Sequence, residues 1–152
     1  MDKDQLKIKI ASIVPDAEFM ENPQFPEFII SPEKLHELAK QLREDSDTAF
    51  DFLFDLTGVD IAGKLGVVYH MRSTTLGHEL VLKVNTTDRL NPAFDSVHDI
   101  WRGAEFLERE VFDLMGIRFN NHPDLRRIFL EEDWVGHPLR KDYTDEVNIV
   151  EL

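Results

Sequence analysis

Apolar residues recur with helical spacing in some parts of the chain and with strand-like spacing in others. Near the start, Leu6, Ile10 and Ile13 follow one another at near-helical intervals until Pro15, which predicts an opening helix. Elsewhere, short apolar runs are bounded by turn residues, as is typical of strands. We therefore expect extended segments at Glu18–Met20, Glu27–Ile30, Leu65–Arg72 and Glu79–Asn85, the last two forming a hairpin through Ser73–His78.

A further strand is predicted where aromatic and acidic residues alternate. Side chains of a strand point to opposite faces in turn, so such a run would have one apolar face. The apolar set is Phe50, Phe52, Phe54 and Leu56, and it alternates with Asp51, Leu53 and Asp55.

Two more helices are expected. Ser31-Pro32-Glu33 offers a hydroxyl cap, a proline at the first helical position and an acid beside the positive end of the helix dipole. One apolar stripe follows, made of Leu35, Leu38, Ala39 and Leu42. The longest helix should run from about Val97 to Met115. It would be opened by Ser96, with Asp99 three residues on, and closed by Gly116, which tolerates the left-handed conformation. Its buried side would hold Val97, Ile100, Trp101, Ala104, Leu107, Val111 and Leu114.

Helices interleaved with strands predict a two-layer α+β domain over residues 1–116, with a mixed β-sheet packed against helices. After Gly116 neither period is sustained, so residues 117–152 should form an irregular C-terminal arm of the same domain. Long irregular segments that stay ordered usually have a role. Either this is a mobile tail, or its aromatic residues dock against a partner; the second reading is favoured by Phe119, Phe129, Trp134 and Tyr143.

Composition narrows the function classes. The net charge of −13 argues against nucleic-acid binding, which relies on basic patches. Residues 117–143 are charge-balanced, with five basic and five acidic side chains. The chain has no cysteine, so it offers no thiolate ligand for zinc or an iron–sulfur cluster. No apolar run is long enough for a membrane span, and the charged N-terminus does not resemble a secretory signal.

The charged side chains of the long helix have two interpretations. Glu105, Arg109 and Asp113 are spaced four residues apart, with Glu108 and Glu110 beside them. Paired carboxylates next to an arginine suit general acid/base chemistry. The same spacing also gives an ordinary salt-bridged helix face, and spacing alone favours this second interpretation.

The segment after the helix contains further candidates. His122 and Asp124 are two residues apart, but two possible ligands do not make a metal site. Arg126 and Arg127 suit bidentate pairing with carboxylates, inside the protein or on a partner. Phosphate binding is disfavoured because no glycine-rich loop precedes them. His137 sits beside a proline turn and is expected to make local hydrogen bonds.

Together these residues resemble a known family, the 30-kilodalton subunits of respiratory complex I. The matching motif is Glu108-Arg109-Glu110, Asp113, Leu114-Met115 and His122, followed by HPDLRRI (122–128), EDW (132–134) and GHPLRKDY (136–143). LTGVD at 56–60 and the Trp101…Ala104 spacing also resemble the family.

The resemblance implies a non-catalytic scaffold subunit in the peripheral arm of a proton-translocating NADH:quinone oxidoreductase. It would bind no cofactor, with FMN and iron–sulfur clusters in partner subunits. It would pack against the quinone-site (49-kDa type) subunit on the cytoplasmic side of the inner membrane. The partner-facing or motif residues would be Glu108, Arg109, Glu110, Asp113, His122, Asp124, Arg126, Arg127, Trp134, His137, Arg140 and Lys141.

Two alternatives stay open. The first is the equivalent subunit of a membrane-bound hydrogenase or of a dehydrogenase that takes electrons from a donor other than NADH. The second is a free-standing hydrolase that uses Glu108, Glu110 and His122, which the absence of a recognisable nucleophile motif disfavours.

Overall fold

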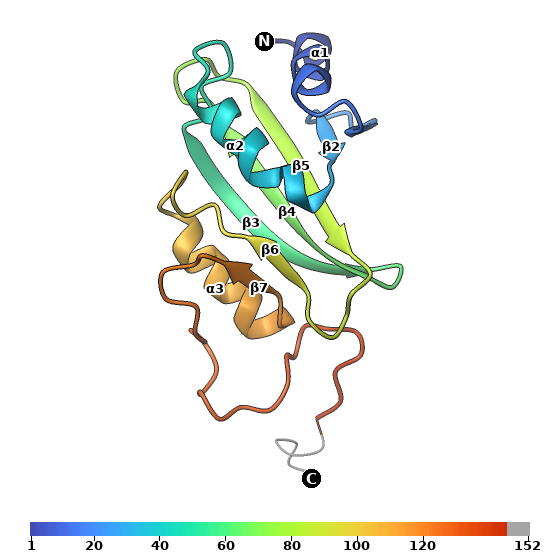
Figure 1. The fold of residues 1–152 in the computed structure, drawn as a ribbon, viewed down its shortest axis with the longest axis vertical. Helices are drawn as coiled ribbons and strands as arrows, with labels where there is room; N and C mark the ends of the chain where they lie inside the picture. The colour runs from blue at the N-terminus through green and yellow to red at the C-terminus, as the bar shows by residue number, and fades with distance from the viewer. Residues whose placement is uncertain (146–152) are drawn as a thin grey trace.

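A twisted five-stranded sheet forms the centre of the protein in the computed structural model, which describes residues 1–145 (Figure 1). The strand order is β1-β2-β5-β4-β3. β2 runs parallel to β5, and the other neighbours are antiparallel, so the sheet is mixed. The strands are β1 (Glu18–Met20), β2 (Glu27–Ile29), β3 (Phe52–Ile61), β4 (Lys64–Arg72) and β5 (Glu79–Thr86). The predicted hairpin is confirmed as β4 and β5.

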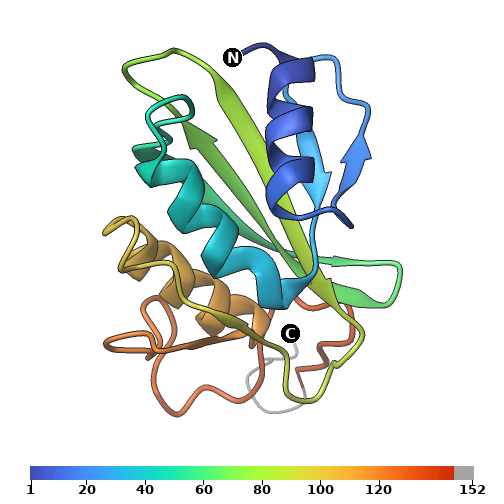
Figure 2. The same ribbon diagram turned by 45° about the horizontal axis from the view of Figure 1, so that its top comes forward.

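Three helices cover one face of this sheet, in front of the strands in Figure 2. They are α1 (Lys3–Ile13), α2 (Leu35–Glu44) and α3 (Ala104–Met115). Side chains from all three belong to one apolar cluster with alternate residues of the strands. The predicted two-layer α+β fold with a mixed sheet is therefore confirmed.

The helix starts follow local hydrogen bonding, with one departure from the sequence prediction. At α1, the side chain of Asp2 accepts from the backbone N–H of Gln5, and the Gln5 side chain accepts from the backbone N–H of Asp2. Before α2, Ser31 makes no side-chain cap, and the single 3₁₀ turn η1 (Pro32–Lys34) forms first. The tight turn replaces the expected hydroxyl cap, because its own backbone bond from Lys34 to Ser31 closes the end.

The alternation predicted for β3 is wrong at its start. Phe52 and Phe54 are 49% and 38% exposed, whereas Leu53 and Leu56 are buried. The pairing with β4 shifts between Leu53 and Asp55, so Phe54 is the extra residue of a β-bulge. A bulge moves side chains to the opposite face, and here it places leucines instead of phenylalanines in the core.

The long helix begins later than predicted. Residues 97–103 form tight turns, with backbone bonds from Ile100 to Val97 and from Ala104 to Trp101, and α3 starts only at Ala104. Gly103, a poor helix former, stands at the junction. The end is as predicted: Gly116 has φ +72°.

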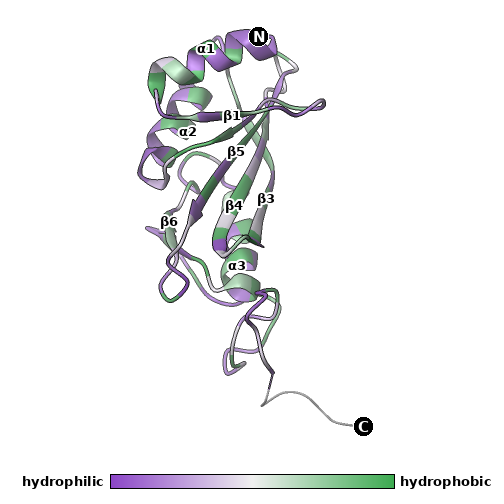
Figure 3. Ribbon diagram, turned by 90° about the vertical axis from the view of Figure 1, so that its right-hand side faces the viewer, coloured by the Kyte–Doolittle hydropathy of each residue, from purple (hydrophilic) through white to green (hydrophobic). Residues whose placement is uncertain are grey.

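Beyond Gly116 the chain forms the arm, which we define as residues 117–145. It begins with β7 (Arg118–Asn120), a short strand that the sequence did not predict, paired in parallel with β6 (Ala93–Asp95). The rest of the arm has no helix or strand and lies at the opposite end of the molecule from α1 (Figure 3). Residues 146–152 of the predicted arm lie outside the described residues. Over the described chain, no helix has both the length and the apolarity needed to cross a membrane.

Candidate functional site: the anchored C-terminal arm

Asp113, in the last turn of α3, fixes the backbone of the arm. Its Oδ2 accepts the backbone N–H groups of Ile128, Phe129 and Leu130 at 3.1, 2.7 and 3.1 Å. Its Oδ1 accepts from Arg127 Nη1 at 2.9 Å. The Asp113 side chain is fully buried. One carboxylate therefore holds three consecutive peptide groups of a segment that has no β-ladder of its own.

The electrostatics of Asp113 are set by two opposing effects. Burial by itself would raise the pKa of this carboxyl group. The backbone N–H of Phe129, the guanidinium of Arg127 and the neighbouring amides outweigh burial, so the pKa lies below its ordinary value. Asp113 is thus a charged group that is stabilised inside the protein by its donors.

Arg127 joins three parts of the arm and helix. Its Nη1 also donates to the backbone carbonyl of Asp113 at 2.9 Å, and its Nη2 donates to the carbonyls of Trp134 and Gly136 at 3.0 and 2.8 Å. The side chain is only 10% exposed. The expected pairing of Arg127 with a carboxylate is confirmed, and its planar donor fork suits such multiple acceptors.

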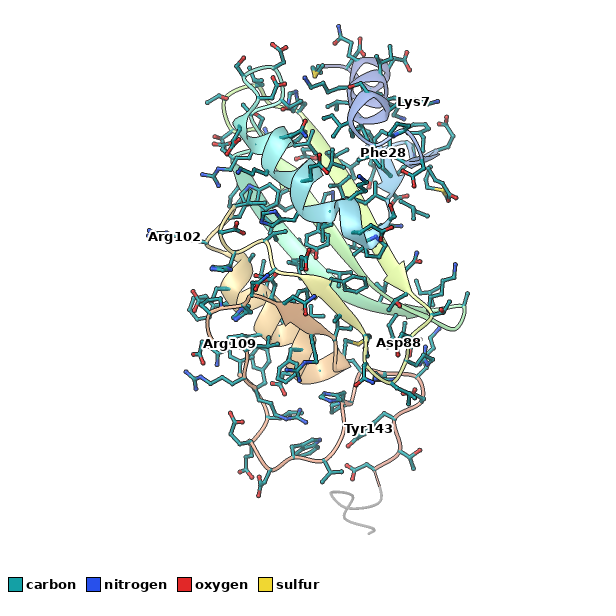
Figure 4. All side chains as sticks on the ribbon, in the orientation of Figure 1. Lys7, Phe28, Asp88, Arg102, Arg109 and Tyr143 are labelled. Atoms are coloured by element: carbon teal, nitrogen blue, oxygen red, sulfur yellow. The ribbon has the colours of Figure 1, made fainter. Side chains whose placement is uncertain are left out.

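The predicted salt-bridged face of α3 is wrong. Arg109 is 7% exposed and donates to the carbonyls of Arg126 and Arg127 at 3.2 and 3.0 Å. It pairs with neither Glu105 nor Asp113. The arm covers this side of the helix, near the labelled Arg109 in Figure 4, and its backbone supplies the partners instead. We call Arg109, Asp113, Arg127 and His137 the arm anchor.

His137 completes the arm anchor. Its Nδ1 lies 2.9 Å from the carbonyl oxygen of Asp113, so this ring nitrogen donates. Next to it, the N–H of Leu139 donates to the carbonyl of Leu114 at 2.9 Å. The ring packs against Gly116 so closely that a Cβ added there would lie 2.6 Å from the ring carbon Cδ2 of His137.

Gly116→Ala is expected to loosen the arm as well as strain the turn. Gly77 is the matched control, because it has φ +81° but nothing within 4 Å of an added Cβ. Gly77→Ala should cost about 1–2 kcal/mol from backbone strain alone. Gly116→Ala should cost at least about 1 kcal/mol more, because the His137 ring must move. Urea denaturation of both variants measures the difference, and equal losses would contradict the role given to His137.

A second set of ion pairs fixes the far end of the arm. Arg89 Nη1 and Nη2 donate to the carboxylate of Asp60, at 2.9 and 2.8 Å, and Nη2 lies 3.1 Å from Asp142. The backbone N–H of Lys141 also donates to Asp60, and Arg140 donates to Asp142 and to the carbonyl of Arg89. The Arg89 guanidinium lowers the pKa of Asp60 to about 2. Figure 4 labels Asp88 and Tyr143, neighbours of this cluster in the sequence.

Glu108 faces away from the arm into the domain. Its side chain is fully buried, with Oε1 2.5 Å from the Ser96 hydroxyl and Oε2 3.0 Å from the backbone nitrogen of Val97. Burial raises its pKa to about 7, although the two hydrogen bonds act in the opposite direction. The Ser96 that was expected to cap α3 is therefore bonded to Glu108 within that helix.

The hydrolase interpretation fails on geometry. Glu108 is bonded to Ser96 and Val97, whereas His122 Nε2 donates to the carbonyl of Glu105 at 2.9 Å. Glu110 lines a separate groove beside β3. No bond joins any two of the three proposed catalytic residues within residues 1–145. The same part of the chain contains no group of three or more ligand side chains that could hold a metal ion.

The comparisons with known proteins place the chain. The family model described as "Respiratory-chain NADH dehydrogenase, 30 Kd subunit" matches residues 28–147. The chain belongs to this family.

Curated members of the 30 Kd subunit family are similar over most of the chain. The C subunit of the NADH-quinone oxidoreductase from Moorella thermoacetica is 40% identical over 137 residues, which are 89% of this chain and 90% of that protein. The C/D subunit of the enzyme from Phocaeicola vulgatus is 52% identical over 120 residues, 78% of this chain. The chain spans only 23% of that longer relative.

The fold also occurs in a solved structure from another respiratory machine. A chain in the membrane-bound sulfane sulfur reductase, an archaeal respiratory membrane complex, superposes with a TM-score of 0.72 and 24% identity. The superposition covers 93% of this chain and 85% of that one. At this identity the likeness concerns the fold alone.

Within the 30 Kd family motif, the structure divides the predicted residues by direction. The arm anchor, His122 and Arg140 make bonds inside the protein. Arg126 and Asp124 form an exposed ion pair with each other at 2.9 Å, which confirms carboxylate pairing for Arg126. Asp60 and Arg89 were missed, although the LTGVD segment had been noted. Ser96 was singled out for a different role.

The outer side of the arm is apolar. Phe129, Val135 and Leu139 are 64%, 57% and 62% exposed. The charged residues of the family motif thus hold the backbone from inside, while apolar side chains point outward. Exposed apolar side chains that gather on one ordered segment are typical of an interaction surface.

Proposed function

We propose that this chain is a non-catalytic scaffold subunit in the peripheral arm of a proton-translocating NADH:quinone oxidoreductase. It would support electron transfer from NADH to quinone that takes place in neighbouring subunits. Membership of the 30 Kd subunit family carries the proposal. The geometry supports it, because the motif charges are engaged in fixing backbone and the arm presents apolar side chains outward.

The partner that we propose is the quinone-site subunit of the 49-kDa type. The longer relatives support this choice, because their names join C to D in chains about four times longer than the matched part. FMN and iron–sulfur clusters would reside in partner subunits, since this chain supplies no thiolate ligand. The assembled complex would hold the chain peripherally, on the cytoplasmic side of the inner membrane.

The sulfane sulfur reductase fold match gives a second candidate, the equivalent subunit of a hydrogenase or of a dehydrogenase with another donor. The greater identity to NADH-quinone oxidoreductase subunits, 40–52%, favours the first. Purification of the tagged chain from native membranes, with the bound chains identified, decides between them. A flavin-bearing, NADH-linked set supports the proposal, and nickel–iron hydrogenase chains would replace it with the second candidate. A chain recovered alone would refute both.

Replacing Phe129 and Val135 with serine is expected to reduce incorporation into the complex at least about tenfold. Each apolar side chain that becomes fully buried at an interface contributes about 1.5–3 kcal/mol. Leu90→Ser and Ile8→Ser are matched controls, because these side chains are 90% and 72% exposed on other segments. Incorporation is measured by quantifying the tagged chain in the purified complex. Equal incorporation of all four variants would contradict docking through the arm.

A further inference from the structure

β3 is a long edge strand of the sheet that is left open. It pairs with β4 on one side and is the last strand in the sheet order. Within residues 1–145, the backbone groups of its outer edge make no other backbone hydrogen bond. At ten residues it is far longer than β1, the three-residue strand at the opposite edge. An exposed edge of this length pairs readily with another chain unless something covers it.

Apolar hollows lie on both sides of this edge. Between β3 and α3, a groove of about 90 Å³ is lined by Leu56, Leu114, Met115 and Leu139 among others. On the opposite face, a hollow of about 290 Å³ is lined by Val59, Ile61 and Val68 with their neighbours. Successive side chains of an added strand would point alternately into these two spaces. Leu139 also connects the groove to the apolar outer side of the arm.

The charges along the edge select the partner. From residue 51 to 63 the chain has Asp51, Asp55 and Asp60 and no Lys or Arg. Asp60 is neutralised by Arg89, but Asp55 and the groove-lining Glu110 have no ion pair among the described residues. Pairing of β3 with β3 of a second copy would bring like charges together, which is unfavourable across strands. A strand with a basic residue would satisfy these carboxylates.

We propose that the open edge of β3 binds an extended segment of a partner subunit as a sixth strand. That segment would alternate apolar side chains and carry at least one Lys or Arg facing Asp55 and Glu110. Main-chain hydrogen bonds would supply affinity, and the two hollows would supply specificity. The inference rests on the proposed scaffold function and names the chemistry of one contact within it.

Site-specific crosslinking in the assembled complex tests the pairing. Because the chain has no cysteine, Asp55→Cys, Thr57→Cys and Val59→Cys each provide one attachment point for a photo-crosslinker, and Ile8→Cys is the control on α1. After irradiation of purified complex, mass spectrometry identifies the linked residues. We expect the three β3 positions to reach one partner segment at two-residue steps, as paired strands require. Helical spacing, capture of a second copy or no crosslink would overturn the proposal.

A charge-reversal series tests the selected chemistry. Asp55→Lys combined with Glu110→Lys should lower incorporation into the complex about tenfold or more, because like charges across an interface repel. Asp16→Lys with Glu33→Lys is the matched control on other exposed sites. Unchanged incorporation of the β3 pair, with loss on Phe129/Val135 replacement, would refute this edge and leave the scaffold function intact. Failure of the unmodified chain to assemble would refute both.

Discussion

Replacing Asp113 with alanine is expected to detach the arm from α3. The substitution removes the acceptor of three consecutive backbone N–H groups and the ion-pair partner of a guanidinium that is 10% exposed. Removing one partner of a buried charged pair costs about 3–5 kcal/mol, because the other charge is left unpaired. The free energy for local opening of the arm should fall by that amount, while the sheet and α2 stay folded.

Hydrogen exchange at the amides of Ile128, Phe129 and Leu130 measures this opening. In the unmodified chain these amides should be protected, and in Asp113→Ala they should exchange at rates near those of free peptide. Asp113→Asn should fall between, because it keeps one oxygen acceptor and loses the charge. Arg126→Ala is the control, since its exposed pair with Asp124 contributes at most about 1 kcal/mol. Retained protection in Asp113→Ala would contradict the anchor.

Glu108→Gln is expected to remove a specific part of the pH dependence of stability. The pKa of Glu108 is raised from 4.5 to about 7 by burial. Between these values the unfolded chain has lost the proton and the folded chain keeps it. The free energy of unfolding therefore falls as pH rises from about 4.5 to about 7, by about 3 kcal/mol in total. Below the lower value this stabilisation is fully present.

Glutamine has no proton to lose, and its amide can still bond to Ser96 and to the N–H of Val97. Relative to the unmodified chain, Glu108→Gln should gain about 3 kcal/mol between pH 5 and pH 8. Urea denaturation at several pH values gives the two curves, and their difference cancels the other titrating groups. Parallel curves over that range would show that Glu108 is ionised in the folded protein.

The elements of the fold were largely predictable, because their signals are local. The stripe from Leu35 to Leu42 and the hairpin before Thr86 are written in spacing and turn residues, and both are present. The bulge at Phe54 was not predictable, since alternation continues through it and only pairing with β4 reveals the shift. The late start of α3 likewise depends on Ser96 being bonded to Glu108.

The site was predictable in its residues but not in its geometry. Spacing along α3 assigned Arg109 and Asp113 to each other, whereas both are bonded to the arm. The arm has no period from which its path can be read, so the contact between Asp113 and Arg127, fourteen residues later, leaves no local signal. The resemblance to the family marked these residues, and the structure gives their physical task.

The arm is ordered mainly by bonds from a few inward side chains to backbone groups, with one three-residue strand at its start. Its path is consequently almost independent of what its outward side chains are. Phe129, Val135 and Leu139 can be exchanged for other residues without altering the course of the chain that carries them. A lineage can therefore change the surface it offers to a partner while the mounting of that surface stays the same.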